Sequence, residues 1–171
     1  MNTAHRQTFD QALNDWRIVF GFARQFALDA AEAEDLAQEA YLKLWAVRAE
    51  LDLERPLLPL LLTTVRNLAR SRLRARRAEA SDELDVELAS DATSPPRLAG
   101  IAEERGLVRG ALASLPAHWR GALFLVDGID LGYRDAAQAL GITEDVLRVT
   151  LHRARQRMRE RIGRVAPGAD S

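Results

Sequence analysis

The sequence of 171 residues contains no cysteine, which excludes disulfide bonds and thiolate-ligated zinc sites. It has only six prolines, and its apolar content of 47% is typical of a folded chain rather than a disordered one. Long apolar runs are missing too: the longest candidate, residues 57–62, is too short for a membrane span and contains Pro59. The first ten residues lack the basic-then-apolar layout of a secretory signal. We therefore expect a cytoplasmic protein with no membrane insertion.

Catalytic and metal-binding patterns are also absent from the sequence. It contains no Ser-His-Asp set and no glycine-rich phosphate loop. A helical carboxylate metal site needs an E-x-x-H motif on partner helices, and the sequence has none, although four carboxylates share one predicted helix: Glu32, Glu34, Asp35 and Glu39. We therefore expect no enzyme activity, no metal and no cofactor.

The formal net charge is only −1, but its distribution along the chain is uneven. Arginines crowd residues 66–77 and 148–164, while acidic side chains gather in residues 32–39 and 79–91. Lys43 is the single lysine, so the protein uses arginine for nearly all of its basic side chains. Either basic stretch, taken alone, could therefore equally be a solvated helix face or a nucleic-acid contact. Phosphate affinity depends on the local patch rather than on the total charge, so the balance does not argue against nucleic-acid binding.

Apolar residues recur with the helical period of 3.6 and strand-like alternation is absent, so the sequence predicts an all-α fold. We expect helices over about residues 8–27, 29–47, 60–77, 101–114 and 116–126, then a short helix and a last helix that ends near residue 162. The inward face of the first helix would carry Phe9, Leu13, Trp16, Phe20 and Ala23. The second helix would bury Leu36, Ala40 and Leu44, with Trp45 as a further candidate.

Cap and turn residues mark the ends of several predicted helices. Asp29 and Glu32 have the spacing of a capping box at the start of the second helix. Gly141 stands where a tight turn between two helices often needs a positive φ. Thr143 is placed to cap the last helix, which carries one apolar stripe and one basic stripe. This layout is typical of a helix-turn-helix whose second helix enters the DNA major groove.

The helical spacing of apolar residues is absent between residues 78 and 100. This stretch is acidic, rich in Ala, Ser and Asp, and ends near Pro95 and Pro96, a composition typical of a flexible linker. We therefore predict two small helical domains, over residues 1–77 and 101–165, joined by a flexible acidic linker over residues 78–100 and followed by a tail over residues 166–171.

Segments on the two sides of this linker together resemble one protein family. AEDLAQEAYLKLW (residues 33–45) and TTVRNLARSRLRARR (residues 63–77) are similar to region 2 of bacterial extracytoplasmic-function RNA polymerase sigma factors. Residues 112–162, which hold the helix-turn-helix, are similar to region 4 of that family. The order, the spacing and the linker agree, so the resemblance covers most of the chain. It implies a protein that docks on core RNA polymerase, recognises a promoter and helps to open it.

The resemblance also implies roles for individual residues. Core RNA polymerase would be bound by an acidic helix face with Asp35, Gln38 and Glu39. The minus-ten element of promoter DNA, where a flipped base is captured, would be held by Arg66, Asn67 and Arg70. The minus-thirty-five element would be read by Arg148, Val149, Thr150, His152 and Arg153, with its phosphates bound by Arg155 and Arg157. An anti-sigma factor is the further partner that the resemblance implies.

Three functional hypotheses stay open at this point. The first is an alternative sigma factor, which would direct promoter-specific transcription with core RNA polymerase. The second is a sigma-like decoy that sequesters an anti-sigma factor without binding DNA, suggested by departures from the family pattern at Leu60, Val149 and Thr150. The third is a stand-alone helix-turn-helix regulator whose N-terminal domain dimerises. A symmetric operator footprint without polymerase would single out the third.

Overall fold

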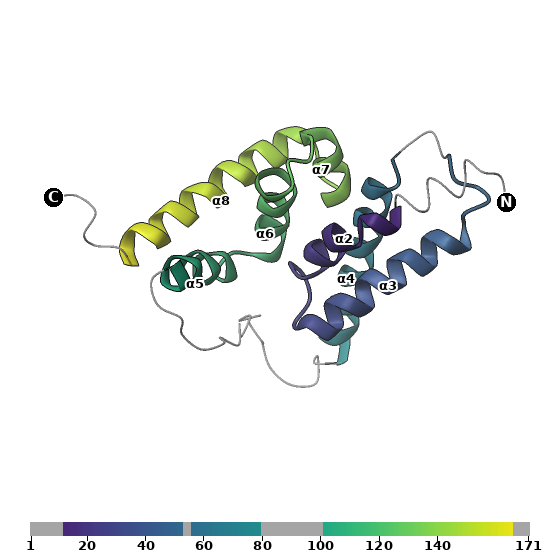
Figure 1. The fold of residues 1–171 in the computed structure, drawn as a ribbon, viewed down its shortest axis with the longest axis horizontal. Helices are drawn as coiled ribbons and strands as arrows, with labels where there is room; N and C mark the ends of the chain where they lie inside the picture. Colours follow the sequence, from purple (N-terminus) through teal and green to yellow (C-terminus); the bar gives the residue numbers. More distant parts are fainter. Residues whose placement is uncertain (1–11, 53–55, 80–100, 166–171) are drawn as a thin grey trace.

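The computed structural model describes residues 12–52, 56–79 and 101–165, and within these ranges it consists of helices joined by turns, without a strand (Figure 1). The predicted all-α fold is confirmed. Phe9, nearly all of the predicted linker and the predicted tail lie outside the described residues. None of the described helices is long and apolar enough to cross a membrane. The same ranges contain no group of three His, Asp or Glu side chains placed to hold a metal ion.

Helices α2 (Trp16–Ala23), α3 (Ala30–Ala46) and α4 (Leu58–Glu79) form the first half of the molecule. Asp29 caps α3 as predicted: the amide of Glu32 donates to Asp29 Oδ1 at 2.8 Å. The return bond of the capping box is shifted by one residue, since Glu32 Oε2 accepts from the amide of Leu28 at 2.7 Å rather than from that of Asp29. Each helix turns one apolar stripe inward, and these stripes meet in a shared core that includes Val19, Phe22, Leu36, Ala40, Leu61, Leu62 and Val65.

The second half contains α5 (Ile101–Ala113), α6 (Ala117–Leu123), α7 (Tyr133–Leu140) and α8 (Glu144–Val165). A π-helical turn, η2 (Phe124–Gly128), directly follows α6, so α6 is shorter than the helix predicted over residues 116–126. Helix α8 packs across α5 and α6. It contributes a buried stripe with a spacing of three or four residues, formed by Leu147, Leu151 and Ala154.

Two side chains predicted to face the core are exposed instead. A turn at Asp15 separates the helical residues 12–14 from α2. Ala12, seven residues before Val19, takes the buried position, so the neighbouring Leu13 is 61% exposed. Trp45 is 45% exposed, with the guanidinium of Arg48 4.4 Å from the centre of its ring. Because Leu44 takes the buried position, Trp45 lies about 100° further around the helix and faces outward.

The two halves pack directly on each other. Helix α4 packs on α7, and α2 contacts η2. A glycine permits one close approach, since a Cβ added to Gly21 would lie 2.7 Å from the ring of Phe124. Arg120 crosses the same interface and donates to the carbonyl oxygen of Gln25 at 2.6 Å. Burial at this interface lowers the pKa of Arg120.

Candidate nucleic-acid interface

The turn between α7 and α8 has the geometry of a helix-turn-helix. Gly141 ends α7 with φ 60° and ψ 41°, a left-handed conformation that strains any residue with a Cβ. Its amide donates to the carbonyl oxygen of Gln138 at 3.0 Å, and the amide of Ile142 donates to that of Ala137 at 3.1 Å. Thr143 Oγ1 accepts a backbone N–H from the first turn of α8 at 3.3 Å. Both the turn glycine and the cap threonine are thus as predicted.

Helix α8 presents one face to solvent. Thr150 does not belong to it, since Thr150 is only 9% exposed and lies on the buried stripe with Leu147 and Leu151. Thr150 is three positions after Leu147, so it lies on the same, core-facing side of the helix and not on the exposed face. The structure does bring together on that face the other four residues predicted to read bases: Arg148, Val149, His152 and Arg153. Arg157 is also exposed, and its guanidinium lies 3.5 Å from Glu160.

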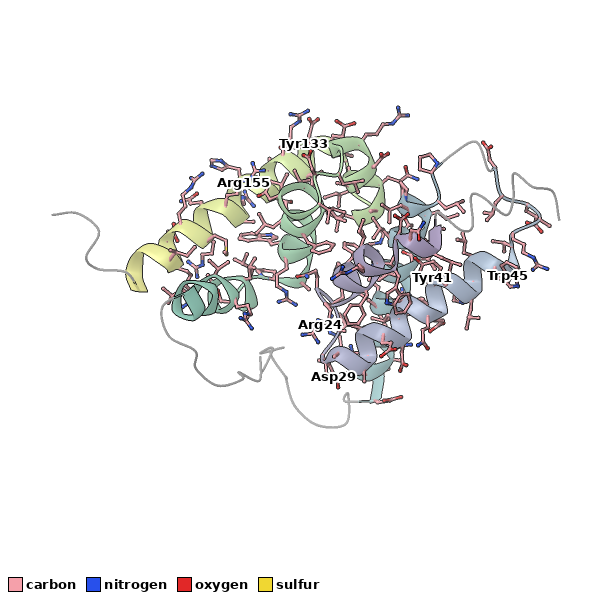
Figure 2. All side chains as sticks on the ribbon, in the orientation of Figure 1. Arg24, Asp29, Tyr41, Trp45, Tyr133 and Arg155 are labelled. Carbon is pink, nitrogen blue, oxygen red and sulfur yellow. The ribbon has the colours of Figure 1, made fainter. Side chains whose placement is uncertain are left out.

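Two arginines of α8 are held by the segment that precedes it. Arg155 donates from Nε and Nη2 to the two carboxylate oxygens of Asp127 in η2, at 3.0 and 2.5 Å. Hydrogen bonding to Asp127 is the main reason why the pKa of Arg155 is raised. The guanidinium of Arg148 lies 5.0 Å from the centre of the ring of Tyr133 at the start of α7. Figure 2 labels Tyr133, at the start of α7, and Arg155, in the middle of α8, near each other.

The basic helix α4 meets the helix-turn-helix directly. Arg66 is half-buried, and its guanidinium lies so close to Gly141 that a Cβ on Gly141 would overlap it. Arg66 Nη2 also donates to Asn67 Oδ1 at 2.7 Å. Burial, and after it the charge of Arg70, lowers the pKa of Arg66. Asn67 and Arg70 are exposed, so only Arg66 of the three predicted minus-ten residues lies against the other half.

The acidic stripe of α3 lies on the outer surface of the first half. Asp35 and Gln38 are exposed, whereas Glu39 is half-buried and pairs with Arg72 of α4 at 3.1 Å. Leu42 belongs to the same stripe and is 67% exposed. Sequence reasoning missed Leu42, although its position seven residues after Asp35 and four after Gln38 was a sufficient signal. The stripe therefore combines carboxylate, amide and apolar side chains.

Comparison with known proteins assigns both halves to one family. Residues 16–79 match the family model of sigma-70 region 2. The chain is 33% identical over 140 residues to the ECF RNA polymerase sigma factor EcfG of Rhodopseudomonas palustris, a match that covers 80% of this chain and 75% of the relative. The chain belongs to the extracytoplasmic-function family of RNA polymerase sigma factors.

The chain is also similar in sequence to two other sigma factors. The chain is 28% identical over 155 residues to the ECF RNA polymerase sigma factor SigM of Bacillus subtilis, covering 90% of this chain and 91% of SigM. It is 33% identical over 150 residues to the probable RNA polymerase sigma factor RfaY of Xanthomonas campestris pv. campestris. That match covers 84% of this chain but only 37% of RfaY, so the chain spans little more than a third of that relative.

Solved structures of sigma factors have the same fold. The sigma factor RpoE of Bartonella quintana, crystallised with the anti-sigma factor NepR, superposes with a TM-score of 0.74 at 26% identity, covering 95% of this chain and 98% of RpoE. CnrH, solved with the cytosolic domain of CnrY, superposes with a TM-score of 0.63 at 20% identity, covering 97% of this chain and 90% of CnrH. Both likenesses extend over the two halves, so the family fold includes both.

Proposed function

We propose that this protein is an alternative sigma factor that binds core RNA polymerase and directs transcription initiation at specific promoters. The observation that carries the proposal is the exposed basic face of α8 behind a well-formed helix-turn-helix, in a chain whose other half matches sigma-70 region 2. In this proposal, region 2 extends over residues 1–77 and region 4 over residues 101–165. The protein would act in the cytoplasm, where core RNA polymerase and promoter DNA are found.

The proposed polymerase contact is the outer stripe of α3. Asp35 and Gln38 supply an exposed carboxylate and amide that suit a basic partner surface. Leu42 adds apolar area that a partner would cover. Glu39 already pairs with Arg72, so we assign it a smaller part in the contact, mainly at the edge of the stripe.

The proposed contact with the minus-thirty-five element is the exposed face of α8 in the major groove. Arg148 and Arg153 have the donors that base edges accept, and Val149 offers a methyl contact to thymine. His152 lies on the same face, and Arg157 would bind a phosphate. Thr150 and Arg155 would act indirectly, by setting the position of α8. Thr150 is buried, and Arg155 is held by Asp127 (both shown above).

The proposed contact with the minus-ten element requires a change in the arrangement of the halves. Asn67 and Arg70 are exposed on α4, whereas Arg66 is half-buried and its guanidinium lies against the turn at Gly141. Nearby, Thr63 Oγ1 approaches the carbonyl oxygen of Gln138 in α7 at 3.5 Å. Because Arg66 lies at the α4–α7 contact, we propose that this contact opens and that the halves separate when the protein binds polymerase.

An anti-sigma factor is the third proposed partner. The similar RpoE chain was crystallised with the anti-sigma factor NepR, and its likeness to this chain extends over both halves. We propose that the packed arrangement of the two halves, in which the guanidinium of Arg66 lies against the turn at Gly141, is the form that such a partner binds.

Run-off transcription with purified core RNA polymerase tests the proposed function. A promoter-dependent transcript is expected when the full chain is added, and Arg148→Ala should reduce it. Arg109→Ala is a matched control, because Arg109 is an exposed arginine on α5 and has no proposed DNA contact. No transcript from any template, combined with tight binding to an anti-sigma protein, would favour the decoy hypothesis instead. A symmetric footprint without polymerase would favour the stand-alone regulator.

A further inference from the structure

Tyr133 is the first residue of α7 and has no DNA contact in the function proposed above. It is half-buried and packs against the hydrophobic core, so the core holds its ring in place. It nevertheless lies beside the outer face of α8 (Figure 2). Two arginines of α8 interact with this one side chain: Arg148, assigned to base reading, and Arg155.

The guanidinium of Arg148 lies against the ring of Tyr133. The guanidinium carbon lies 5.0 Å from the ring centre, within the range of a cation–π interaction. Its pair with Glu144, one turn earlier on α8, spans 3.9 Å between side chains that are 63% and 47% exposed, which makes it a weak ion pair. A long, exposed arginine has many rotamers, and a rigid aromatic face against the planar guanidinium restricts them.

Arg155 lies seven residues after Arg148, two turns further along α8. Its guanidinium forms the bidentate hydrogen bonds to Asp127, and hydrogen bonding with Tyr133 contributes as well to the raised pKa of Arg155. The segment that carries Asp127 and Tyr133 is itself tied down, because the amide of Leu131 donates to the carbonyl oxygen of Leu125 at 2.8 Å. Residues 127–133 thus contact α8 at two side chains, Arg148 and Arg155.

We propose that Tyr133 is a positioning residue for promoter recognition: its ring holds Arg148 ready for a base edge, while Asp127 holds Arg155 on the same side of α8. This inference rests on the proposed minus-thirty-five contact of α8. A guanidinium that is already in place loses less conformational freedom when DNA binds. Tyr133 therefore acts on sequence discrimination through Arg148, without touching the DNA itself.

The test compares holoenzymes assembled from core RNA polymerase and the full chain. Affinity is measured for a cognate promoter and for each single-base-pair variant of its minus-thirty-five element. The Arg148→Ala variant first identifies the base pair that Arg148 reads: at that position, a base-pair change that weakens binding of the wild type no longer weakens binding of the variant. Tyr133→Leu is then expected to reduce discrimination at that base pair about two- to fivefold, the size of an exposed cation–π contact, and to leave the other base pairs unchanged. Tyr133→Phe keeps the ring and should keep this discrimination.

Two further measurements separate positioning from a loss of structure. In the Arg148→Ala background, Tyr133→Leu should have no additional effect on discrimination. Urea unfolding measures the stability of each variant. If Tyr133→Leu unfolds, Tyr133→Met replaces it, because methionine keeps the apolar volume without an aromatic face, and the same loss of discrimination is expected. Equal loss at every base pair, or a loss that persists without Arg148, would overturn the positioning role. If the wild-type holoenzyme neither binds nor transcribes the promoter, the proposed function fails instead, so the two failures are distinguishable.

Discussion

The two arginine-rich helices α4 and α8 look alike in sequence, but their arginines are engaged differently. Helix α4 packs on both α3 and α7: Arg66 lies against the turn at Gly141, and the ion pairs to α3 are Arg72–Glu39 and Arg76–Glu32. Helix α8 buries one stripe and turns the other to solvent. On its exposed side, the ion pairs join residues of the same helix, Arg148–Glu144 and Arg157–Glu160.

This comparison teaches that the neighbours of a helix, rather than its arginine content, decide what its arginines do. An arginine paired across two helices helps to hold them together, and its release weakens that contact. An exposed arginine paired within its own helix contributes little to stability, so it can exchange its acid for a phosphate at small cost. Promoter contact by Arg66 of α4 therefore competes with a contact between the halves, whereas promoter contact by Arg157 of α8 competes only with its pair to Glu160 in the same helix.

The largest effect is expected from removing the buried support of α8. Leu151 is fully buried, so Leu151→Ala should lower the free energy of unfolding by about 2–5 kcal/mol. Val149→Ala, two residues earlier on the exposed side, should change it by no more than roughly 0.5 kcal/mol. Urea unfolding followed by circular dichroism measures both. Similar losses for the two variants would contradict the division of α8 into a buried and an exposed stripe.

The next effect concerns the exposed arginines of α8 as DNA contacts. Arg148→Ala should weaken binding to the cognate promoter by about 1–3 kcal/mol and relax the sequence preference at one base pair. Arg157→Ala should weaken binding to all sequences alike and lower the slope of affinity against salt by about 1. Fluorescence anisotropy with cognate and random DNA over a salt series separates the two. Equal effects of both substitutions on both DNAs would remove the base-reading role of Arg148.

A smaller effect is expected where α4 meets the turn before α8. Gly141→Ala should lower the free energy of unfolding by about 1–2 kcal/mol, because alanine is strained at φ 60°. The added Cβ would also displace the guanidinium of Arg66, so the loss should be less in the Arg66→Ala background. Gly110→Ala is the matched control: Gly110 lies inside α5 with open space around it, and the change should stabilise by up to about 1 kcal/mol. A neutral Gly141→Ala variant in urea unfolding would contradict this account of the turn.

The smallest effects should come from the ion pairs themselves. Glu32 is only 14% exposed beside Arg76, so a double-mutant cycle of this pair between α3 and α4 should give a coupling of up to about 1 kcal/mol. The pair of Arg157 and Glu160 within α8 should give about 0.3–0.5 kcal/mol or less. Both cycles are measured by urea unfolding at low and high salt. A larger coupling within α8 than between α3 and α4 would contradict the statement that arginines paired between helices stabilise the fold more than those paired within one helix.

The ends of helices could be predicted from the sequence where the signal is local. Asp29 with Glu32, and Thr143 at the start of α8, act on backbone groups within four residues, so their spacing alone shows the interaction. Gly141 was predictable for the same reason. The break at Asp15 was not, because the apolar period continues through it. Leu13 was placed on the wrong face because the small Ala12, rather than the larger Leu13, takes the buried position in line with Val19. The short α6 was missed since η2 keeps the apolar spacing of a helix for one more turn.

The sequence by itself determined the all-α class, the helix-turn-helix and the resemblance to one family, because helical period and cap residues are short-range properties. Only the tertiary structure decided which functional side chains are accessible. Arg155 and Asp127 are 28 positions apart, and their pairing withdraws Arg155 from the exposed set. Arg66 and Gly141 are further apart still and meet only because α4 packs on α7. A periodic pattern shows that a helix has two faces, but the partner that covers each face is set by packing between distant segments of the chain.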